Sequence, residues 1–127
     1  MTARVFLLLG AVNAFLAVAL GAFGAHGLRG QIDPSLLSAF ETGVQYHGLH
    51  ALGLLCIGLL TRSHTSSWLA ASGWLLTSGI LLFSGSLYLM ALTGTRALGI
   101  ITPVGGIALL AGWLALARAV WRLPPRP

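Results

Sequence analysis

The chain has 127 residues, of which 57% are hydrophobic and 7% are charged, and its mean hydropathy is +0.91. A soluble globular domain carries about 25% charged residues, so this composition excludes that class and indicates an integral membrane protein. The net charge of +5 comes from arginines that are scattered at the ends of apolar runs and form no basic face, which excludes nucleic acid as an expected partner.

Four apolar runs predict four transmembrane helices. A helix needs about 20 mainly apolar residues to cross the hydrocarbon layer, and the runs of this length cover roughly residues 5–25, 39–61, 68–92 and 103–122. Their connections are short, so consecutive helices are expected to be antiparallel neighbours. We therefore expect an all-α integral membrane bundle with up-down-up-down topology, in a single domain that covers residues 1–127.

The positions of the arginines predict how this bundle is oriented. The larger group lies on the side of both termini and the smaller group on the opposite side: Arg4, Arg62, Arg118, Arg122 and Arg126 against Arg29 and Arg96. Because cytoplasmic loops carry the excess of positive residues, both termini are expected in the cytoplasm. The first run also resembles a secretion signal, but it is long enough to span, and we expect it to be retained.

Small residues recur at helical spacing in the first and last predicted helices. The first series is Gly10, Asn13, Ala17, Gly21 and Gly24, and the second includes Gly105, Ala108, Gly112, Ala115 and Ala119. Small side chains allow helix backbones to approach closely in lipid, where packing replaces the hydrophobic effect. Both series are predicted to be helix-packing faces, and Asn13 is expected to add a hydrogen bond to another helix.

The polar stretch 40–52 in the second helix contains the main candidate ligand-binding residues. Helical periodicity places Tyr46, His47 and His50 on one side, and Glu41, Gln45 and Gly48 on another. Ionisable groups inside a membrane are costly and usually face the protein interior, so the first group is expected to line a pocket in the outer half of the bundle. In the third helix Ser84 and Tyr88 fall at a similar depth and are the expected partners of the two histidines.

His26 is expected to cover this pocket from outside. It lies in the segment Gly24-Ala25-His26-Gly27, where the glycines make a regular helix doubtful. A flexible, glycine-flanked segment at the membrane surface can direct this imidazole towards the second helix.

Other polar residues have structural explanations. Asp33 and Pro34 form a typical N-cap and first helical position, and Thr102 with Pro103 predicts the cap of the fourth helix. Glu41 is expected to pair with Arg29 or Arg96. The single cysteine, Cys56, is interpreted as a small buried hydrophobic residue.

A metal site has weak support in the sequence. The pair His47 and His50 supplies two ligands, whereas zinc usually takes three or four from protein. His26 could be a third ligand, but Glu41 lies on the other side of the helix. No metal ligand is therefore assigned, and His26 with His50 are the candidates if a metal or haem is bound.

Several motifs together resemble one family of small membrane proteins, the domain of unknown function 423, with its YgdD-like and YwdK-like members. The motifs are Gly21-Ala22-Phe23-Gly24-Ala25-His26-Gly27-Leu28, Tyr46-His47-x-x-His50-Ala51-Leu52, Leu82-Phe83-Ser84-Gly85-Ser86-Leu87-Tyr88, and Leu98-Gly99-x-x-Thr102-Pro103-x-Gly105-Gly106. The resemblance implies four helices in a bacterial inner membrane and brings no settled activity. Its motif residues match at His26, Tyr46, His50, Ser84, Tyr88 and Thr102, and less closely at His47.

Three functional hypotheses follow. The first is a non-enzymatic protein without a cofactor, which binds or moves a small or lipid-like molecule or acts as an accessory subunit. The second is a redox protein that binds haem, copper or a quinone through His26 and His50. The third is an oligomeric pore. The expected partners are the lipid bilayer and, as an open alternative, further copies of the chain or a larger membrane complex.

Overall fold

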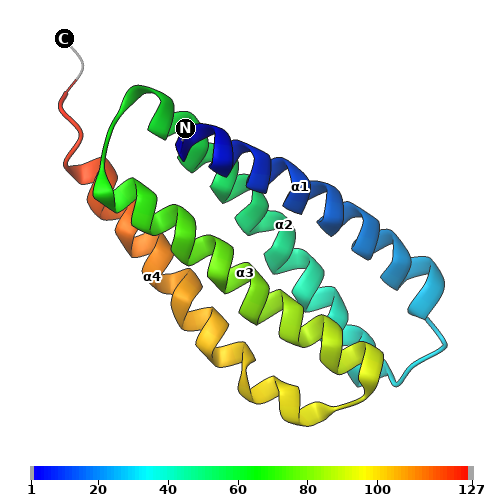
Figure 1. Cartoon of the computed structure of the whole chain (residues 1–127). Coiled ribbons are helices and arrows are strands. Elements are labelled where there is room, and N and C mark those ends of the chain that lie inside the picture. The colour runs from blue at the N-terminus through cyan, green and yellow to red at the C-terminus, as the bar shows by residue number, and fades with distance from the viewer. Residues whose placement is uncertain (1, 126–127) are drawn as a thin grey trace.

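The computed structural model describes residues 2–125 and contains four long helices and two short helical segments (Figure 1). In chain order these are α1 (Thr2–Phe23), η1 (Gly24–Leu28), α2 (Pro34–Ser63), α3 (Ser67–Thr93), η2 (Arg96–Ile100) and α4 (Thr102–Trp121). Four helices are long and apolar enough to cross a membrane, and the described residues contain no strand. The predicted fold class, an all-α bundle of four membrane-spanning helices, is confirmed.

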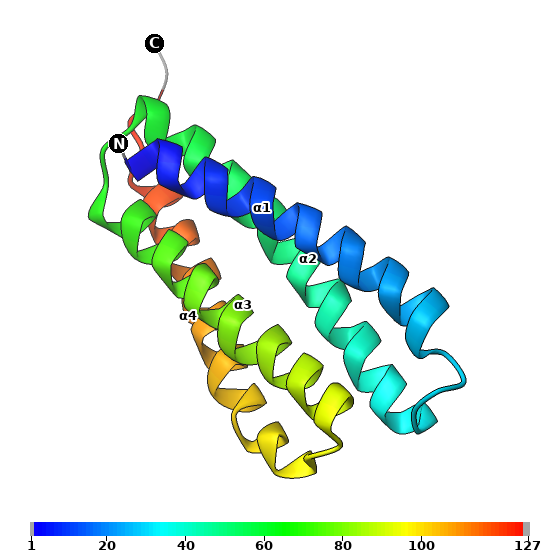
Figure 2. The ribbon, with the colours of Figure 1, turned by 45° about the vertical axis from the view of Figure 1, so that its right-hand side comes forward.

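The helices form two antiparallel pairs, α1 with α2 and α3 with α4, and the pairs meet along α2 and α3. Figures 1 and 2 show α1 and α4 on opposite flanks. We call the end that carries the start of α1, the end of α4 and the α2–α3 connection the terminal end, and the end that carries η1 and η2 the distal end. Because α2 and α3 each have neighbours on two sides, their side chains form most of the interior.

Helix boundaries at the distal end follow local chemistry. Asp33 caps α2 as predicted, since its carboxylate accepts hydrogen bonds from the Ser35 N–H at 2.8 Å and the Ser35 hydroxyl at 2.6 Å. Helix α3 ends at Thr93 and is capped by Gly94, whose φ of +72° favours glycine. The prediction for Thr102 was wrong. It is the first residue of α4 and its hydroxyl pairs with that of Ser86 at 2.6 Å, so it links α4 to α3.

The segment around His26 is a helix of a different type. The α-helical pattern stops at Phe23, as the glycines suggested, and the chain continues as the π-helical turn η1. Gly24 lies against the ring of Phe40 in α2, where a Cβ atom would be 2.9 Å from Cε1. The absence of a side chain at Gly24 therefore lets this segment lie in close contact with α2.

Leucine side chains of one helix pack against glycines of its partner helix, and each helix of a pair contributes both a glycine and a leucine. A Cβ atom at Gly10 would lie 2.8 Å from Cγ of Leu55, and one at Gly58 would lie 2.8 Å from Cγ of Leu7. The same exchange joins α3 and α4, through Gly79 with Leu109, Gly112 with Leu76, and Gly105 with the backbone at Phe83. Because a side chain at these glycines would collide with the partner helix, each pair packs at close range.

Two apolar clusters fill the interior. One, towards the terminal end, contains Phe6, Leu54, Ile57, Leu76, Ile80 and Leu109, and the other, at the distal end, contains Leu28, Leu36, Phe40 and Ala91. Cys56 belongs to neither. The prediction that it is buried was wrong, because its side chain is exposed on the outer surface of α2.

Candidate functional site

The polar side chains of α2 point in several directions, so the structure divides what the sequence suggested as one pocket. Glu41 faces outwards and pairs with Arg29 at 3.2 Å, one of its two predicted partners. His47 points between α1 and α3. Tyr46 and His50 point towards α4. The two histidines, three residues apart, therefore have different neighbours.

His47 is at the centre of a hydrogen-bond chain that crosses three helices. Its Nδ1 lies 2.9 Å from the Tyr88 hydroxyl in α3, and its Nε2 lies 2.8 Å from Oδ1 of Asn13 in α1. The Asn13 amide group donates to the Leu9 carbonyl at 2.8 Å, which leaves its Oδ1 as an acceptor. His47 must therefore carry its proton on Nε2, and Tyr88 donates to Nδ1. Both ring nitrogens are satisfied.

Ser84 takes part in a different contact from the one predicted. Its hydroxyl donates to the Gly43 carbonyl in α2 at 2.7 Å, and the side chain is buried. Gly43 also allows the ring of Tyr88 to approach, since a Cβ atom there would be 3.0 Å from Cε1 of that ring. Of the two expected partners, the structure brings Tyr88 to His47 and places Ser84 at the helix backbone.

His50 has one ring nitrogen bound and one available. Its Nδ1 lies 2.6 Å from the Tyr46 carbonyl oxygen, which can only accept, so Nδ1 carries a proton. A charged imidazolium is costly among apolar side chains, and the ring is therefore neutral, with a lone pair on Nε2. Among the described residues no hydrogen bond reaches Nε2, although every fully enclosed side-chain nitrogen and oxygen has a partner. Nε2 is consequently not fully enclosed, although His50 as a whole is only 3% exposed, and the residue lines a groove.

This His50 groove has a volume of about 440 Å³ and lies between α2, α3 and α4. Its lining residues are Tyr46, Leu49, His50, Phe83, Pro103, Gly106, Ile107, Leu109, Leu110 and Trp113. The Tyr46 ring stacks on His50 with centroids 6.0 Å apart, and Trp113 lies 5.8 Å from His50. The imidazole, the Tyr46 hydroxyl and the indole N–H of Trp113 are thus the side-chain polar groups of residues that line an otherwise apolar and aromatic surface.

The groove opens on the outer surface of the helices near the middle of the bundle. Leu49, Ile107 and Leu110 on its rim are exposed. His50 lies 16 residues after the start of α2, which is about 24 Å along a helix of about 45 Å. A molecule dissolved in the apolar part of a bilayer could therefore enter from the side.

His26 lies away from both histidines of α2. Its segment η1 packs at the distal end, where Gly24 contacts Phe40, and ten residues separate Phe40 from His50, about 15 Å along the helix. The His26 side chain is exposed. The structure therefore does not place it over the His50 groove or in one ligand set with His50. Within residues 2–125 no three His, Cys, Asp or Glu side chains are close enough to hold a metal ion.

The residues of the predicted packing faces contact neighbouring helices. Ala17, Gly21 and Gly24 lie against α2 residues Gly48, Val44 and Phe40 respectively. Asn13 makes the expected bond to another helix, and its partner is His47.

Sequence reasoning missed the α4 side of the groove. Gly106, Leu110 and Trp113 recur at helical spacing, but none of them was among the predicted site residues. The spacing of Gly106 and Trp113 was the available signal, because a glycine and an aromatic residue on one face of α4 form a surface against which the Tyr46 ring of α2 can lie.

Comparisons with known proteins agree with this architecture. Residues 20–106 match the family model "Protein of unknown function (DUF423)". The chain is 49% identical over 123 residues to the UPF0382 membrane protein YwdK of Bacillus subtilis, which covers 91% of this chain and 95% of that protein. It is 50% identical over 118 residues to a UPF0382 membrane protein of Staphylococcus epidermidis, with 91% and 94% covered. No solved structure matches. With four apolar helices and these relatives, the chain is a multi-pass membrane protein and belongs to the DUF423 family.

Proposed function

We propose that this protein is a non-enzymatic membrane protein that binds a lipid-soluble molecule bearing a hydroxyl group in the His50 groove. The observation that carries the proposal is the Nε2 lone pair of His50, which faces an apolar groove without a partner among the described residues. A hydrogen-bond acceptor in such surroundings favours a ligand that brings a donor, because a ligand without one leaves the acceptor unsatisfied.

Two further features support a small amphiphilic ligand. The volume of about 440 Å³ lies within the range of small-molecule sites, about 300–1,000 Å³. The aromatic rings of Tyr46, Phe83 and Trp113 offer flat apolar contact, and the open rim suits an acyl or prenyl chain that continues into the bilayer. The same chemistry would serve a carrier that moves the molecule or an accessory subunit that presents it.

Trp113 provides a direct test, because it lines the groove. In a variant with phenylalanine at Trp68, Trp74 and Trp121, quenching of the remaining fluorescence by a terminally brominated long-chain alcohol should be compared with quenching by its methyl ether. The two probes match in size, but only the alcohol donates. The alcohol should bind about 2- to 10-fold more tightly, as expected for one hydrogen bond.

The His50→Leu variant should abolish this preference, and the matched His26→Leu variant should keep it. Equal binding of alcohol and ether to the unsubstituted His50 groove would overturn the proposal. Loss of the preference in His26→Leu would also overturn it, since His26 lies outside the groove.

We further propose that the chain forms one domain in the bacterial plasma membrane with both termini in the cytoplasm. The support is the arginine excess at the terminal end. In a Cys56→Ala background, a membrane-impermeant maleimide added to whole cells, with the outer membrane permeabilised where one exists, should label Thr95→Cys and not Thr65→Cys. The reverse labelling would contradict this orientation.

A further inference from the structure

The two ends of the bundle differ in how their arginines are neutralised. The chain has two acidic side chains, Asp33 and Glu41, and both lie at the distal end. There Glu41 pairs with Arg29 at 3.2 Å, and Asp33 lies 3.9 Å from Arg96, which also donates to the Ser35 hydroxyl at 3.0 Å. The distal end is therefore close to neutral.

The terminal end has arginines without acidic side chains. Of the described residues, Arg4, Arg62, Arg118 and Arg122 lie there, at the start of α1 and at the ends of α2 and α4. No Asp or Glu of the chain is within reach of them. No acidic side chain of the described residues neutralises them, so this end of the bundle is positively charged.

A hollow of about 500 Å³ lies beside two of these arginines, between the start of α3 and the end of α4. Its lining residues are Ser63, His64, Thr65, Ser66, Ser67, Trp68, Ala119, Arg122, Leu123 and Pro124. Arg118 lies over Trp68, with Cζ 5.8 Å from the ring centroid. The lining thus combines an arginine with serine and threonine residues, whose polar groups are donors that suit phosphate oxygens.

Trp68 and Trp121 fix the depth of this hollow. Tryptophan concentrates where the hydrocarbon meets the headgroups, and both rings are exposed at this end of the bundle. Arg122 follows directly after Trp121, so its guanidinium lies at headgroup level. A site at the level of the headgroups suits a lipid phosphate, whereas a site for a dissolved anion has no reason to lie at this depth.

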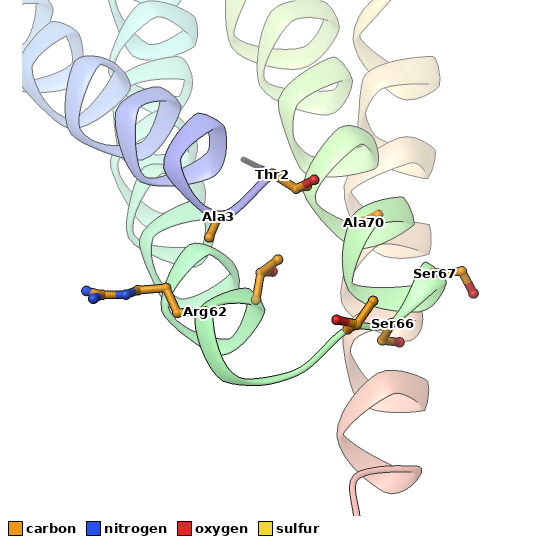
Figure 3. A pocket seen from close by; sticks show the side chains of 8 residues that line it. Thr2, Ala3, Arg62, Ser66, Ser67 and Ala70 are labelled. Carbon is orange, nitrogen blue, oxygen red and sulfur yellow. The ribbon is translucent and has the colours of Figure 1, made fainter.

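The neighbouring hollow on the other side of the α2–α3 connection also has an arginine and hydroxyl groups, but no tryptophan lines it. It is lined by Thr2, Ala3, Thr61, Arg62, Thr65, Ser66, Ser67 and Ala70, and Figure 3 shows the Arg62 side chain pointing away from the serines. The guanidinium there is directed outwards, so we assign no ligand to it.

We propose that the hollow at Trp68 and Arg122 binds the phosphodiester headgroup of an anionic phospholipid. Arg122 and the hydroxyl groups beside it bind the phosphate oxygens, and Arg118 adds positive charge from its place over Trp68. The acyl chains lie against the exposed apolar surface of α4, which includes Leu114 and Trp121. This site is separate from the His50 groove and does not depend on its ligand.

Native mass spectrometry of the full chain in detergent can test this site, with phosphatidylglycerol and phosphatidylcholine of identical acyl chains as probes. Phosphatidylglycerol should bind more tightly, and Arg122→Gln should weaken it about fivefold, the effect expected for one arginine near an anionic headgroup. Arg118→Gln should weaken it by a similar factor. Circular dichroism should show unchanged helix content in both variants, because both side chains are exposed.

Arg4→Gln is the matched control, since it removes the same charge from the same end but outside the hollow. It should weaken phosphatidylglycerol binding less than twofold. Equal effects of Arg4→Gln and Arg122→Gln would show that phosphatidylglycerol is attracted by the overall positive charge of this end and not by the hollow, and would overturn the proposal. Equal binding of the two lipids, or displacement of phosphatidylglycerol by an equal concentration of inorganic phosphate, would also overturn it.

Discussion

His47 and His50 lie one turn apart on α2, and the structure gives them opposite states. His47 carries its proton on Nε2 and has a partner at each nitrogen, on α1 and α3. His50 carries its proton on Nδ1, which its own helix binds, and presents Nε2 to a groove. One imidazole therefore joins helices, while the other lines the groove in which we propose that a ligand binds. The comparison shows that residue type and depth do not decide which role a membrane histidine takes; the partners of each nitrogen decide it.

The largest expected effect on stability comes from replacing His47, whose two ring nitrogens both have partners. His47→Leu leaves the Tyr88 hydroxyl and the Asn13 amide without their partner in the interior, and should lower the free energy of unfolding by about 2–3 kcal/mol. Unfolding in a titration of denaturing detergent measures this loss. Tyr88→Phe should cost less, because His47 then loses one partner of two. If His47→Leu were as stable as the unmodified protein, the hydrogen-bond chain would have no structural role.

His50, which has a partner at only one ring nitrogen, should contribute little to the stability of the fold. His50→Leu removes one bond to the carbonyl of its own helix, which already has a place in the helical ladder, and should change the free energy of unfolding by less than about 1 kcal/mol. The same titration gives the answer. A loss as large as that of His47→Leu would make His50 a second structural histidine and would remove the distinction between the two.

The smallest effect on stability is expected at Asp33, the exposed cap of α2, which gives a reference for the effects of the two buried histidines. Hydrogen bonds from the Ser35 side chain and backbone, with a contribution from Arg96, lower the pKa of Asp33 below its ordinary 3.8. Its charged form therefore stabilises the folded chain above that pH, and this stabilisation is lost as the pH falls through the lowered pKa.

Asp33→Ala should accordingly lower the melting temperature slightly at pH 7. The difference from the unmodified protein should shrink as the pH falls below about 3.8. A difference that grew on acidification would contradict the assignment of Asp33 as a charged cap.

The sequence predicted the helices better than the site, and the reason is geometric. Apolar runs and the Asp33-Pro34 start define helices because length and capping are local properties. Which neighbour a side chain meets depends on how each helix is rotated about its axis. His47 and His50 differ by about 60° around α2, and that is enough to direct one towards α1 and α3 and the other towards α4.

The partners of the histidines show the same limit. Depth along the helices brought Tyr88 and Ser84 to the level of the polar stretch, which was sufficient to predict Tyr88 as a partner of the histidines but not that His47 is the one it meets. Depth alone could not predict that Ser84 in α3 donates to the Gly43 carbonyl in α2. That contact depends on the absence of a side chain at Gly43, which leaves the backbone carbonyl open to Ser84. The groove on α4 was missed since it is built mostly from apolar residues, which resemble any lipid-facing surface.

The reciprocal fit of leucines into glycines has a consequence for how the chain is made. Gly10 with Leu55 and Gly58 with Leu7 complete the interface between α1 and α2, so this hairpin can close before α3 has left the ribosome. The hairpin of α3 and α4 repeats the arrangement with residues of its own. Each hairpin thus has close-packing contacts of its own, whereas the hydrogen bond between His47 and Tyr88 joins the two hairpins and can form only when they have docked.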